Sequence, residues 1–232
     1  MVDRRERADR ILDTAKDLLL RWGYRRVTID EIAARAGVGK GTVYLHWRTR
    51  DQIFLAVAAR EAAEMTDAVA AAMAADPYEA ALHRYMRRFF VEAMRRPVLR
   101  AVFTRDADTL GKLLAVPAHR TLEHAKLLSS HEYLGLLADA GLLRAGLRPA
   151  DLDYPLPTIV YGFFAIEPLL APDLDLSLES KADHLADTLR RTFGPAREPS
   201  RARFAAVAPK ATAVFTQLAR DFRAAAYGGP DE

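Results

Sequence analysis

Apolar residues recur at helical spacing along almost the whole chain. They return every three or four positions, as on one face of an α-helix, in four long stretches: 11–22, 82–94, 156–164 and 178–193. We find no stretch with the period-two alternation of a half-buried strand. Glycine and proline residues fall between the helical stretches and separate them. The pattern therefore predicts an all-α protein with nine or ten helices.

Two helix boundaries in the second half of the chain follow from turn-forming residues. Asp76 and Pro77 suit the N-cap and first position of the helix that carries residues 82–94. Residues 194–202 have the composition of a linker. Beyond this linker the apolar spacing predicts one further helix over about 209–226, with Pro209 near its start.

Residues 27–50 predict two short helices joined by a tight turn. Thr28 and Glu31 have the spacing of a capping box, so that a helix should begin at Ile29. Gly37 is suited to the left-handed conformation that ends such a helix. A second short helix should run from about Lys40 to Trp47, with its buried residues spaced four apart.

A second capping box, formed by Thr49 and Gln52, should open a long helix that reaches about residue 75. Two short helices with a glycine turn between them form the helix-turn-helix pattern. In this pattern the second helix enters the major groove of DNA with its N-terminal end towards the base edges. The sequence therefore predicts a DNA-binding segment within the first fifty residues.

The second short helix and its flanks carry side chains suited to DNA contacts. Lys40 can donate to a guanine edge, and Gly41 has no side chain to keep the backbone from the groove floor. Hydroxyl, imidazole and guanidinium groups nearby can donate to phosphate oxygens. The predicted DNA-contacting residues are Thr28, Lys40, Gly41, Thr42, Tyr44, His46 and Arg50. For Thr28 a helix cap alone is the competing interpretation, whereas Trp47 is interpreted as a core residue.

These residues resemble the DNA-binding domain of the TetR family of bacterial regulators. The resemblance covers about the first sixty residues, and one departure is Gly39, where the family often has serine. It implies a homodimer, a nearly palindromic DNA operator and a C-terminal domain that binds a small molecule and releases DNA. It also implies a dimer interface from the helices at about 153–170 and 177–193. The matching residues are Ile11-Leu12-Asp13-Thr14-Ala15, Leu18 through Gly23-Tyr24, Thr28, Ile32, Ala33, Ala36-Gly37-Val38, Lys40-Gly41-Thr42-Val43-Tyr44, His46-Trp47 and Arg50.

This interpretation divides the chain into three parts. Residues 1–50 are expected to form a helix-turn-helix domain, continued by a linking helix over 51–75. Residues 76–193 are expected to form a larger helical bundle for ligand binding and dimerisation. Residues 194–232 are expected to add a linker and an extra C-terminal helix, whose role the sequence leaves open.

The distribution of charge agrees with a polyanion-binding segment at the N-terminus. Residues 1–50 contain twelve Lys or Arg and seven Asp or Glu, a net charge of +5, whereas the remaining chain is at −2. The chain has no cysteine, and no apolar run approaches the roughly 20 residues that span a bilayer. The N-terminus lacks the features of a signal peptide, so we expect a cytoplasmic protein without a membrane partner.

The middle of the chain offers candidates for a site that binds a small, largely apolar ligand. The aromatic residues chosen are Phe89, Phe103, Tyr133, Tyr161 and Phe163, each of which could equally be a core residue. The spacing of His119, His124 and His131 does not suit a metal site, so neither a metal nor a cofactor is expected. Glu167 could orient a ligand amine or face solvent.

Several other functions compete with a ligand-released repressor. Residues 37–42 fail the Walker pattern, because Gly41 follows Lys40 where Ser or Thr is required. No nucleophile, base and orienting group have enzyme-like spacing, so a catalytic site is not expected. An architectural DNA-binding protein would be basic throughout, which this chain is not. A regulator that activates transcription, or one that needs no ligand, remains open.

Overall fold

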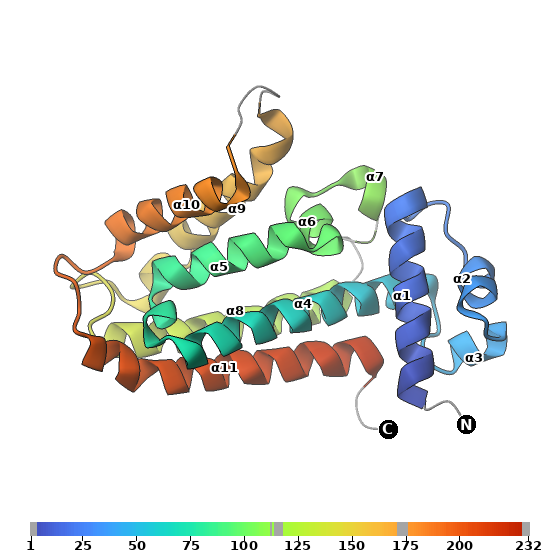
Figure 1. Ribbon diagram of the computed structural model, residues 1–232, viewed down its shortest axis with the longest axis horizontal. Coiled ribbons are helices and arrows are strands. Elements are labelled where there is room, and N and C mark those ends of the chain that lie inside the picture. The colour runs from blue at the N-terminus through green and yellow to red at the C-terminus, as the bar shows by residue number, and fades with distance from the viewer. Residues whose placement is uncertain (1–3, 112, 114–117, 171–175, 229–232) are drawn as a thin grey trace.

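The computed structural model describes residues 4–111, 113, 118–170 and 176–228, with side chains for all of them except 107 and 118–128. Within these residues the chain forms helices and no strands, which confirms the predicted all-α fold (Figure 1). The α-helices are α1 (Arg4–Trp22), α2 (Ile29–Ala36), α3 (Lys40–Tyr44), α4 (Arg50–Ala75), α5 (Leu82–Arg95), α6 (Pro97–Thr104), α7 (Ala107–Leu110), α8 (Ala118–Asp139), α9 (Pro155–Ala165), α10 (Leu178–Phe193) and α11 (Arg201–Tyr227). Short 3-10 helices are η1 (Pro77–Ala80), η3 (Pro149–Leu152) and η4 (Glu167–Leu169).

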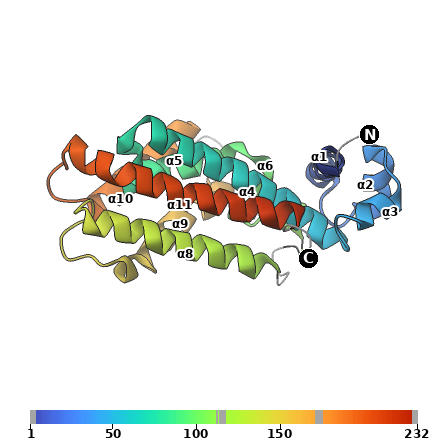
Figure 2. The same cartoon turned by 90° about the horizontal axis from the view of Figure 1, so that it is seen from below.

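The helices form an N-terminal unit, α1 to α3, at one end of a longer body, η1 to α11 (Figures 1 and 2). The helix α4 belongs to both, because its first half packs on α1 while its second half packs on α5, α8 and α11. Antiparallel to α4 and beside it lies α11, which ends next to α1. None of the helices within the described residues is both long enough and apolar enough to cross a membrane.

Both predicted capping boxes are present. The Thr28 hydroxyl accepts a hydrogen bond from the Glu31 amide at 3.2 Å, and the Glu31 carboxylate accepts one from the Thr28 amide at 2.9 Å. Thr49 and Gln52 repeat the arrangement at the start of α4. Each box satisfies amides that have no partner inside their helix, which fixes where α2 and α4 begin.

The N-terminal unit packs around a core built from α1, α2, α3 and the first half of α4. Residues from α6, α7 and α11 complete this core, so the unit is continuous with the body. At the turn after α1, the Tyr24 amide donates to the Thr109 carbonyl of α7 at 2.9 Å. Gly23 has a φ of +73°, and a Cβ there would lie 2.6 Å from the Asp108 carbonyl oxygen. The close approach of α7 therefore requires glycine at this turn.

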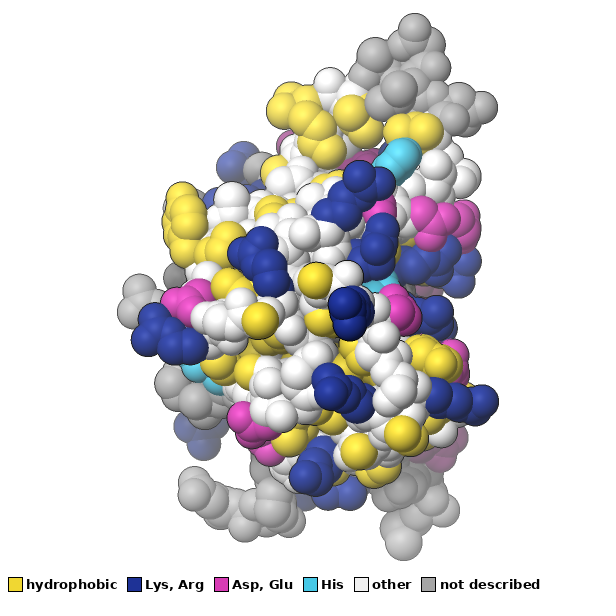
Figure 3. Space-filling model, turned by 90° about the vertical axis from the view of Figure 1, so that its left-hand side faces the viewer, with side chains coloured by type: hydrophobic (Ala, Val, Ile, Leu, Met, Phe, Trp, Pro, Cys, Tyr) yellow, Lys and Arg dark blue, Asp and Glu magenta, His cyan; other side chains and the backbone are white. Residues whose placement is uncertain are grey.

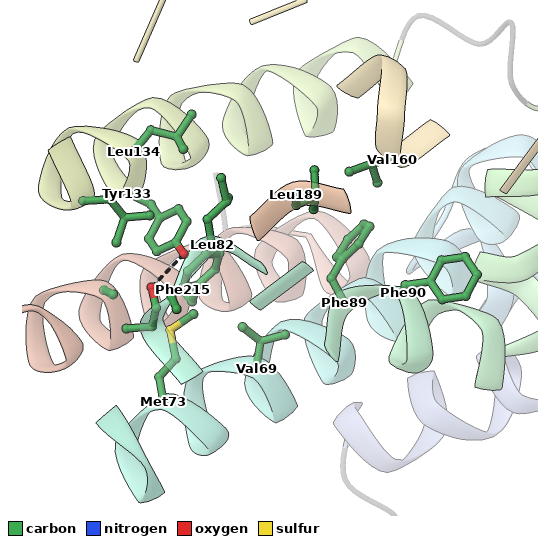
Figure 4. Close-up of a cluster of buried hydrophobic side chains, with 14 of the residues drawn as sticks. Val69, Met73, Leu82, Phe89, Phe90, Tyr133, Leu134, Val160, Leu189 and Phe215 are labelled. Carbon is green, nitrogen blue, oxygen red and sulfur yellow. Dashed lines mark hydrogen bonds between the residues drawn. The ribbon is translucent and has the colours of Figure 1, made fainter. Parts of the chain in front are cut away.

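The body has its own hydrophobic core, which extends from the second half of α4 to α11 (Figure 4). Tyr133 is 1% exposed, and its hydroxyl donates to the Ala80 carbonyl at 2.9 Å, so its one polar group is satisfied inside the core. Phe90 and Phe164 are fully buried, with ring centroids 4.8 Å apart. The stretches 82–94, 156–164 and 178–193, which the apolar spacing predicts to be helical, therefore form helices that contribute to this core.

The last helix is longer than its sequence pattern predicts. It begins at Arg201, eight positions before Pro209, and Pro209 lies inside it. A proline in a helix interior removes one backbone hydrogen bond and crowds the preceding turn. The buried residues Phe204, Val207 and Ala208 of the additional turns pack into the body core and hold them in place. The linker is correspondingly shorter than the predicted 194–202.

Two other predicted boundaries differ in the structure. Asp76 is an N-cap, as predicted, but it caps η1, and α5 begins only at Leu82. The second short helix ends at Tyr44 and not at Trp47, although the amides of His46 and Trp47 still donate to the Val43 carbonyl. Among the residues that the structure describes, the eleven α-helices also exceed the predicted nine or ten, since α7 has only four residues and no amphipathic period to reveal it.

We expect Gly23→Ala to destabilise the protein by about 1–3 kcal/mol, because the new methyl group meets the backbone of α7 and the positive φ disfavours alanine. Chemical denaturation with urea measures the change. The control is Gly135→Ala in α8, where nothing lies within 4 Å of the added carbon and where alanine favours the helix. Equal unfolding midpoints for the two variants would contradict the proposed contact.

Candidate nucleic-acid interface and ligand cavity

The turn between α2 and α3 has the geometry that the sequence predicts. Gly37 adopts φ +65° and ψ +37°, and its amide donates back to Ala34 while the Val38 amide donates to Ala33. These bonds end α2 and turn the chain sharply into α3. Val43 is fully buried and Trp47 is 6% exposed, so the inward face of α3 is fixed against the core. The opposite face is left to solvent.

Lys40 stands at the first position of α3 and forms an ion pair with Asp30 of α2. The distance from Lys40 Nζ to Asp30 Oδ1 is 2.8 Å, and both side chains are at least half exposed. The hydrogen bond to Asp30 raises the pKa of Lys40, which is therefore charged at neutral pH. An incoming guanine edge would compete with Asp30 for the ammonium group.

Gly41 lies next to Lys40 on the exposed face of α3. A Cβ at this position would meet nothing within 4 Å, so no contact inside the chain requires glycine here. Tyr44 follows one turn later with 44% of its surface exposed, and Thr42 is half-buried. The structure thus brings Lys40, Gly41 and Tyr44 to one open face.

His46 is less exposed than its predicted outward position suggests. Its ring lies against Trp47, with centroids 5.2 Å apart. Burial, together with the positive charges of Arg4 and Arg7 on α1, lowers the pKa of His46. The imidazole is therefore neutral at pH 7 and can serve as a hydrogen-bond donor but not as a cation.

Thr28 and Arg50 both have structural partners of their own. The Thr28 hydroxyl is engaged with Glu31 as a helix cap. The Arg50 guanidinium donates to the Val27 carbonyl at 3.0 Å and lies 4.2 Å above the ring of Tyr24. These contacts hold the start of α4 against the turn before α2. A phosphate contact by either residue stays a prediction, and it would need an N–H or O–H group that these internal contacts leave available.

Two residues at this face were not predicted from the sequence. Leu45, directly after α3, is 77% exposed, although an apolar side chain of this size is normally covered. It can make the apolar contact that a thymine methyl group offers in the major groove. Asp30 was missed as the partner of Lys40. The four-residue spacing of Val43 and Trp47 places Leu45 outside the buried face, so the sequence pattern is enough to predict that Leu45 is exposed.

The body contains a cavity between α4, α5, α6 and α11. This first cavity has a volume of about 90 Å³ and is lined mainly by aliphatic and aromatic side chains, including Met65, Phe103 and Phe215. Thr66 and Tyr85 bring hydroxyl groups to it. The Thr66 hydroxyl donates to the Ala62 carbonyl at 2.7 Å. Burial raises the pKa of Tyr85, which stays protonated as a donor.

A second cavity, of about 210 Å³, lies between α5, α8 and α9. Its described lining is also largely apolar, with Ser130, His131 and Asp153 as the polar residues. His131 Nε2 lies 2.7 Å from Asp153 Oδ1. The two cavities share four aromatic side chains as their common wall: Tyr85, Phe89, Phe103 and Tyr161.

Three of the five predicted ligand-contacting residues, Phe89, Phe103 and Tyr161, line both cavities. Tyr133 and Phe163 are placed elsewhere: Tyr133 bonds to Ala80 in the core, and Phe163 packs edge-on against Phe90. The apolar pattern of a helix predicts which side chains face the core, but it does not predict which of those side chains border a cavity.

Glu167 neither faces solvent nor is free for a ligand, since its carboxylate accepts a hydrogen bond from Lys181 at 2.9 Å. The side chains of His119 and His124 lie outside the described residues. Where the structure does describe side chains, it holds no group of three His, Asp or Glu that could bind a metal.

The helices α9 and α10 differ from the predicted pair of apolar stripes. The apolar residues of α10, such as Leu185 and Leu189, are buried within the chain, and its outer face carries charged side chains. By contrast, α9 and η4 leave Tyr161, Ile166 and Leu169 exposed, Leu169 by 77%. In Figure 3, which faces the end of the body away from the N-terminal unit, apolar side chains gather at the top, and charged ones are interspersed elsewhere.

Comparison with known proteins finds similarity to one family and to several individual proteins. The family model described as "Bacterial regulatory proteins, tetR family" matches residues 11–57. The HTH-type transcriptional regulator AlkX of Mycobacterium tuberculosis is 31% identical over 99 residues, which are 41% of this chain. The match spans 46%, about half, of the length of AlkX.

Solved structures share the fold over most of the chain. The transcriptional regulator FadR from Bacillus subtilis, in complex with stearoyl-CoA, has a TM-score of 0.58 and 16% identity, covering 78% of this chain and 96% of that one. NalD, the secondary repressor of the MexAB-OprM multidrug efflux pump in Pseudomonas aeruginosa, has a TM-score of 0.57 and 19% identity, covering 82% and 96%. The proteins named here are described as transcriptional regulators or repressors, in agreement with the expectation that the chain is not an enzyme.

We expect Gly41→Ala to weaken DNA binding by about tenfold or more without loss of stability. The methyl group meets nothing in the free protein, and alanine favours the helix by up to about 1 kcal/mol. On DNA the same methyl group would separate the backbone from the groove. Thermal unfolding and fluorescence anisotropy with labelled DNA measure the two effects. Unchanged DNA affinity would show that α3 does not approach DNA at Gly41.

We expect Asp30→Asn to strengthen DNA binding at low salt, because it releases the Lys40 ammonium group and removes a negative charge from the exposed face. The gain should shrink as salt rises, since screening weakens exposed charges. Dissociation constants measured over a salt series test this. Asp17→Asn, at an exposed position of α1, is the control of equal charge change. Weaker binding by Asp30→Asn at every salt concentration would mean that Asp30 holds Lys40 in its binding position.

Proposed function

The chain belongs to the TetR family of bacterial regulatory proteins, and we propose that it is a homodimeric transcriptional repressor that a small, largely apolar ligand releases from its operator. The observation that carries the proposal is the open face of α3, where Lys40, Gly41 and Tyr44 lie together on a helix-turn-helix. Residues 1–50 would form the DNA-binding domain, with 51–75 as the link. Residues 76–193 would bind ligand and a second copy, and 194–232 would add the linker and C-terminal helix.

Each copy of α3 would enter the major groove at one half of a nearly palindromic operator. Two recognition helices grip neighbouring half-sites when their separation is near one turn of DNA, about 34–36 Å. The N-terminal segment, with its net charge of +5, supplies the attraction to phosphates. Base contacts from Lys40 would select the sequence, and Thr28, Thr42, Tyr44, His46 and Arg50 would contribute phosphate contacts.

The two cavities support a ligand of apolar character. Their walls offer aromatic and aliphatic side chains with few polar groups, as small-molecule sites in helical proteins do. FadR from Bacillus subtilis, which shares the fold, was crystallised with stearoyl-CoA, and NalD is a repressor. We propose that Phe89, Phe103 and Tyr161 contact the ligand, and that Tyr133 and Phe163 support the site from the core.

Selection of genomic DNA fragments by the purified protein, followed by sequencing, tests the function. We expect an enriched, nearly palindromic motif. Enrichment of DNA without any common motif would contradict a sequence-specific regulator. Reporter transcription from the selected site then distinguishes repression, our expectation, from activation.

The roles of Lys40 and Tyr44 should separate in binding measurements on variants of that motif. Lys40→Ala should relax the base preference at one position, at a cost of about 1–3 kcal/mol there. Tyr44→Phe should weaken binding to all sequences about equally, because phosphates carry no sequence information. If Tyr44→Phe changes the preferred base and Lys40→Ala does not, the two assignments are reversed.

We expect Leu169→Glu to convert the homodimer to monomers, because it places a charge in the exposed apolar face of α9 and η4. Light scattering should give twice 25.8 kDa for the unaltered chain and 25.8 kDa for the variant. Leu45→Glu is the matched control, because Leu45 is equally exposed, at 77%, but lies beside α3. A monomeric unaltered chain at micromolar concentration would contradict the homodimer.

A ligand that releases DNA must bind the DNA-free state more tightly, and operator DNA must weaken ligand binding by the same factor. Thermal-shift screening of apolar metabolites and drugs should yield a binder whose affinity falls at least tenfold when operator is added. Equal affinities with and without operator would show that the cavities do not control DNA binding.

A further inference from the structure

The last turn of α11 contacts the N-terminal unit directly. Ala226 is fully buried in the same core as Val43 and Trp47. The Trp47 indole N–H donates a hydrogen bond to the Ala226 carbonyl at 3.1 Å, and this bond is buried. The last carbonyls of a helix have no partner within it, so Trp47 caps α11 from outside. Because Trp47 comes three positions after the end of α3 at Tyr44, the cap lies next to the predicted DNA-contacting helix.

Tyr227 adds a second set of contacts between α11 and the N-terminal unit. Its hydroxyl donates to the Asp9 carboxylate of α1 at 2.5 Å, and the Arg5 guanidinium lies 3.1 Å from its ring centroid. Arg60 of α4 lies 3.6 Å from the same carboxylate of Asp9. One turn earlier, Arg223 pairs with Asp67 of α4. The end of α11 is therefore held by α1, by α4 and by Trp47.

The same helix lines the first cavity. Phe215, Leu218 and Phe222 form part of its wall, on the face that points to α4 and α5. Ala226 comes eight positions after Leu218, a distance of about 12 Å along a helix. No glycine or proline interrupts this stretch, so it moves as a stiff rod. A change in the cavity wall therefore reaches Trp47 through a single helical segment.

We propose that the last turn of α11 positions the DNA-binding unit and transmits the state of the first cavity to it. Ala226 and Tyr227 are positioning residues, which act on DNA through Trp47 and α1. A molecule that enters the cavity presses on Leu218 and Phe222, α11 shifts, and Trp47 moves with its cap. The coupling between cavity and Trp47 stands on the contacts above, and its effect on DNA rests on the proposed function.

Fluorescence of Trp47 reports on this contact without DNA. In a Trp22→Phe background Trp47 is the one remaining tryptophan of the chain. A chain that stops after Ala225 lacks the cap and Tyr227, and its Trp47 emission should shift to longer wavelength as the indole meets water. A chain that stops after Gly228 keeps both residues and serves as the control, with unchanged emission. Unchanged emission in the shorter chain would overturn the proposal.

Leu218→Phe imitates an occupied cavity, because it adds bulk to the wall from α11. In the full chain it should shift the Trp47 emission, and in the chain that stops after Ala225 it should add no further shift. Thermal unfolding verifies that each variant is folded. Tyr227→Phe, which removes only a hydroxyl group, replaces the truncation if that chain does not fold, and should reduce the shift. A folded Leu218→Phe protein with unshifted Trp47 emission would overturn the coupling.

DNA affinity completes the test, with the operator selected above as the probe. Truncation after Ala225 should weaken binding by about tenfold or more, and Leu218→Phe should weaken it in the full chain only. A merely stabilising α11 would give Leu218→Phe the same fold-change in both chains, which would overturn the proposal. If the selection yields no operator motif while the Trp47 emission still shifts as expected, the proposed function is contradicted and the coupling stays supported.

Discussion

The structure depends on α4 being one uninterrupted helix that belongs to two hydrophobic cores. Its 26 residues contain no glycine or proline, and alanine, glutamate and methionine favour the helix throughout. Residues from Ile53 to Ala59 complete the core of the N-terminal unit, and those from Ala63 to Met73 complete the core of the body. A break in this helix would leave both cores open. The orientation of α2 and α3 is therefore set by a rod whose other half is buried among α5, α8 and α11.

The junction between the two cores on α4 carries a buried charge. Glu61 is 1% exposed and lies 2.5 Å from the Lys16 ammonium group of α1, and the Leu99 amide at the start of α6 donates to it at 3.4 Å. A buried carboxylate without partners is costly, so α1, α4 and α6 must keep this arrangement together. An apolar residue at this position would tolerate many packings of the three helices. The ion pair accepts only the one that brings Lys16 to Glu61.

The features that the sequence predicted correctly depend on residues that lie close together in the chain. The two capping boxes and the turn at Gly37 depend on residues three or four positions apart, and all three are present. Contacts between distant residues could not be read in the same way: Trp47 and Ala226 are separated by 179 positions, and no periodicity links them. Packing also overrode a local rule at Pro209, where buried neighbours sustain a helix that proline should end. Aromatic residues on one helix face gave the core, but only the packed structure separates Phe89, beside a cavity, from Tyr133, beside Ala80.

Two antiparallel helices, α4 and α11, connect the N-terminal unit to the body, and this double connection restricts how the unit can move relative to the body. A unit on a single rod can swing about the end of that rod in several directions. With α11 capped by Trp47 and tied to α1 through Tyr227, such swings would have to break a buried hydrogen bond. Sliding of α11 along α4 would break the ion pair between Arg223 and Asp67, and it would keep the contacts of Trp47 and Tyr227 only if α1 and the segment after α3 moved with α11. Because the first cavity lies between these two helices, a molecule that fills it would act on their relative position, as the coupling proposed above requires. On that proposal, the position of α3 depends on how α11 packs along α4.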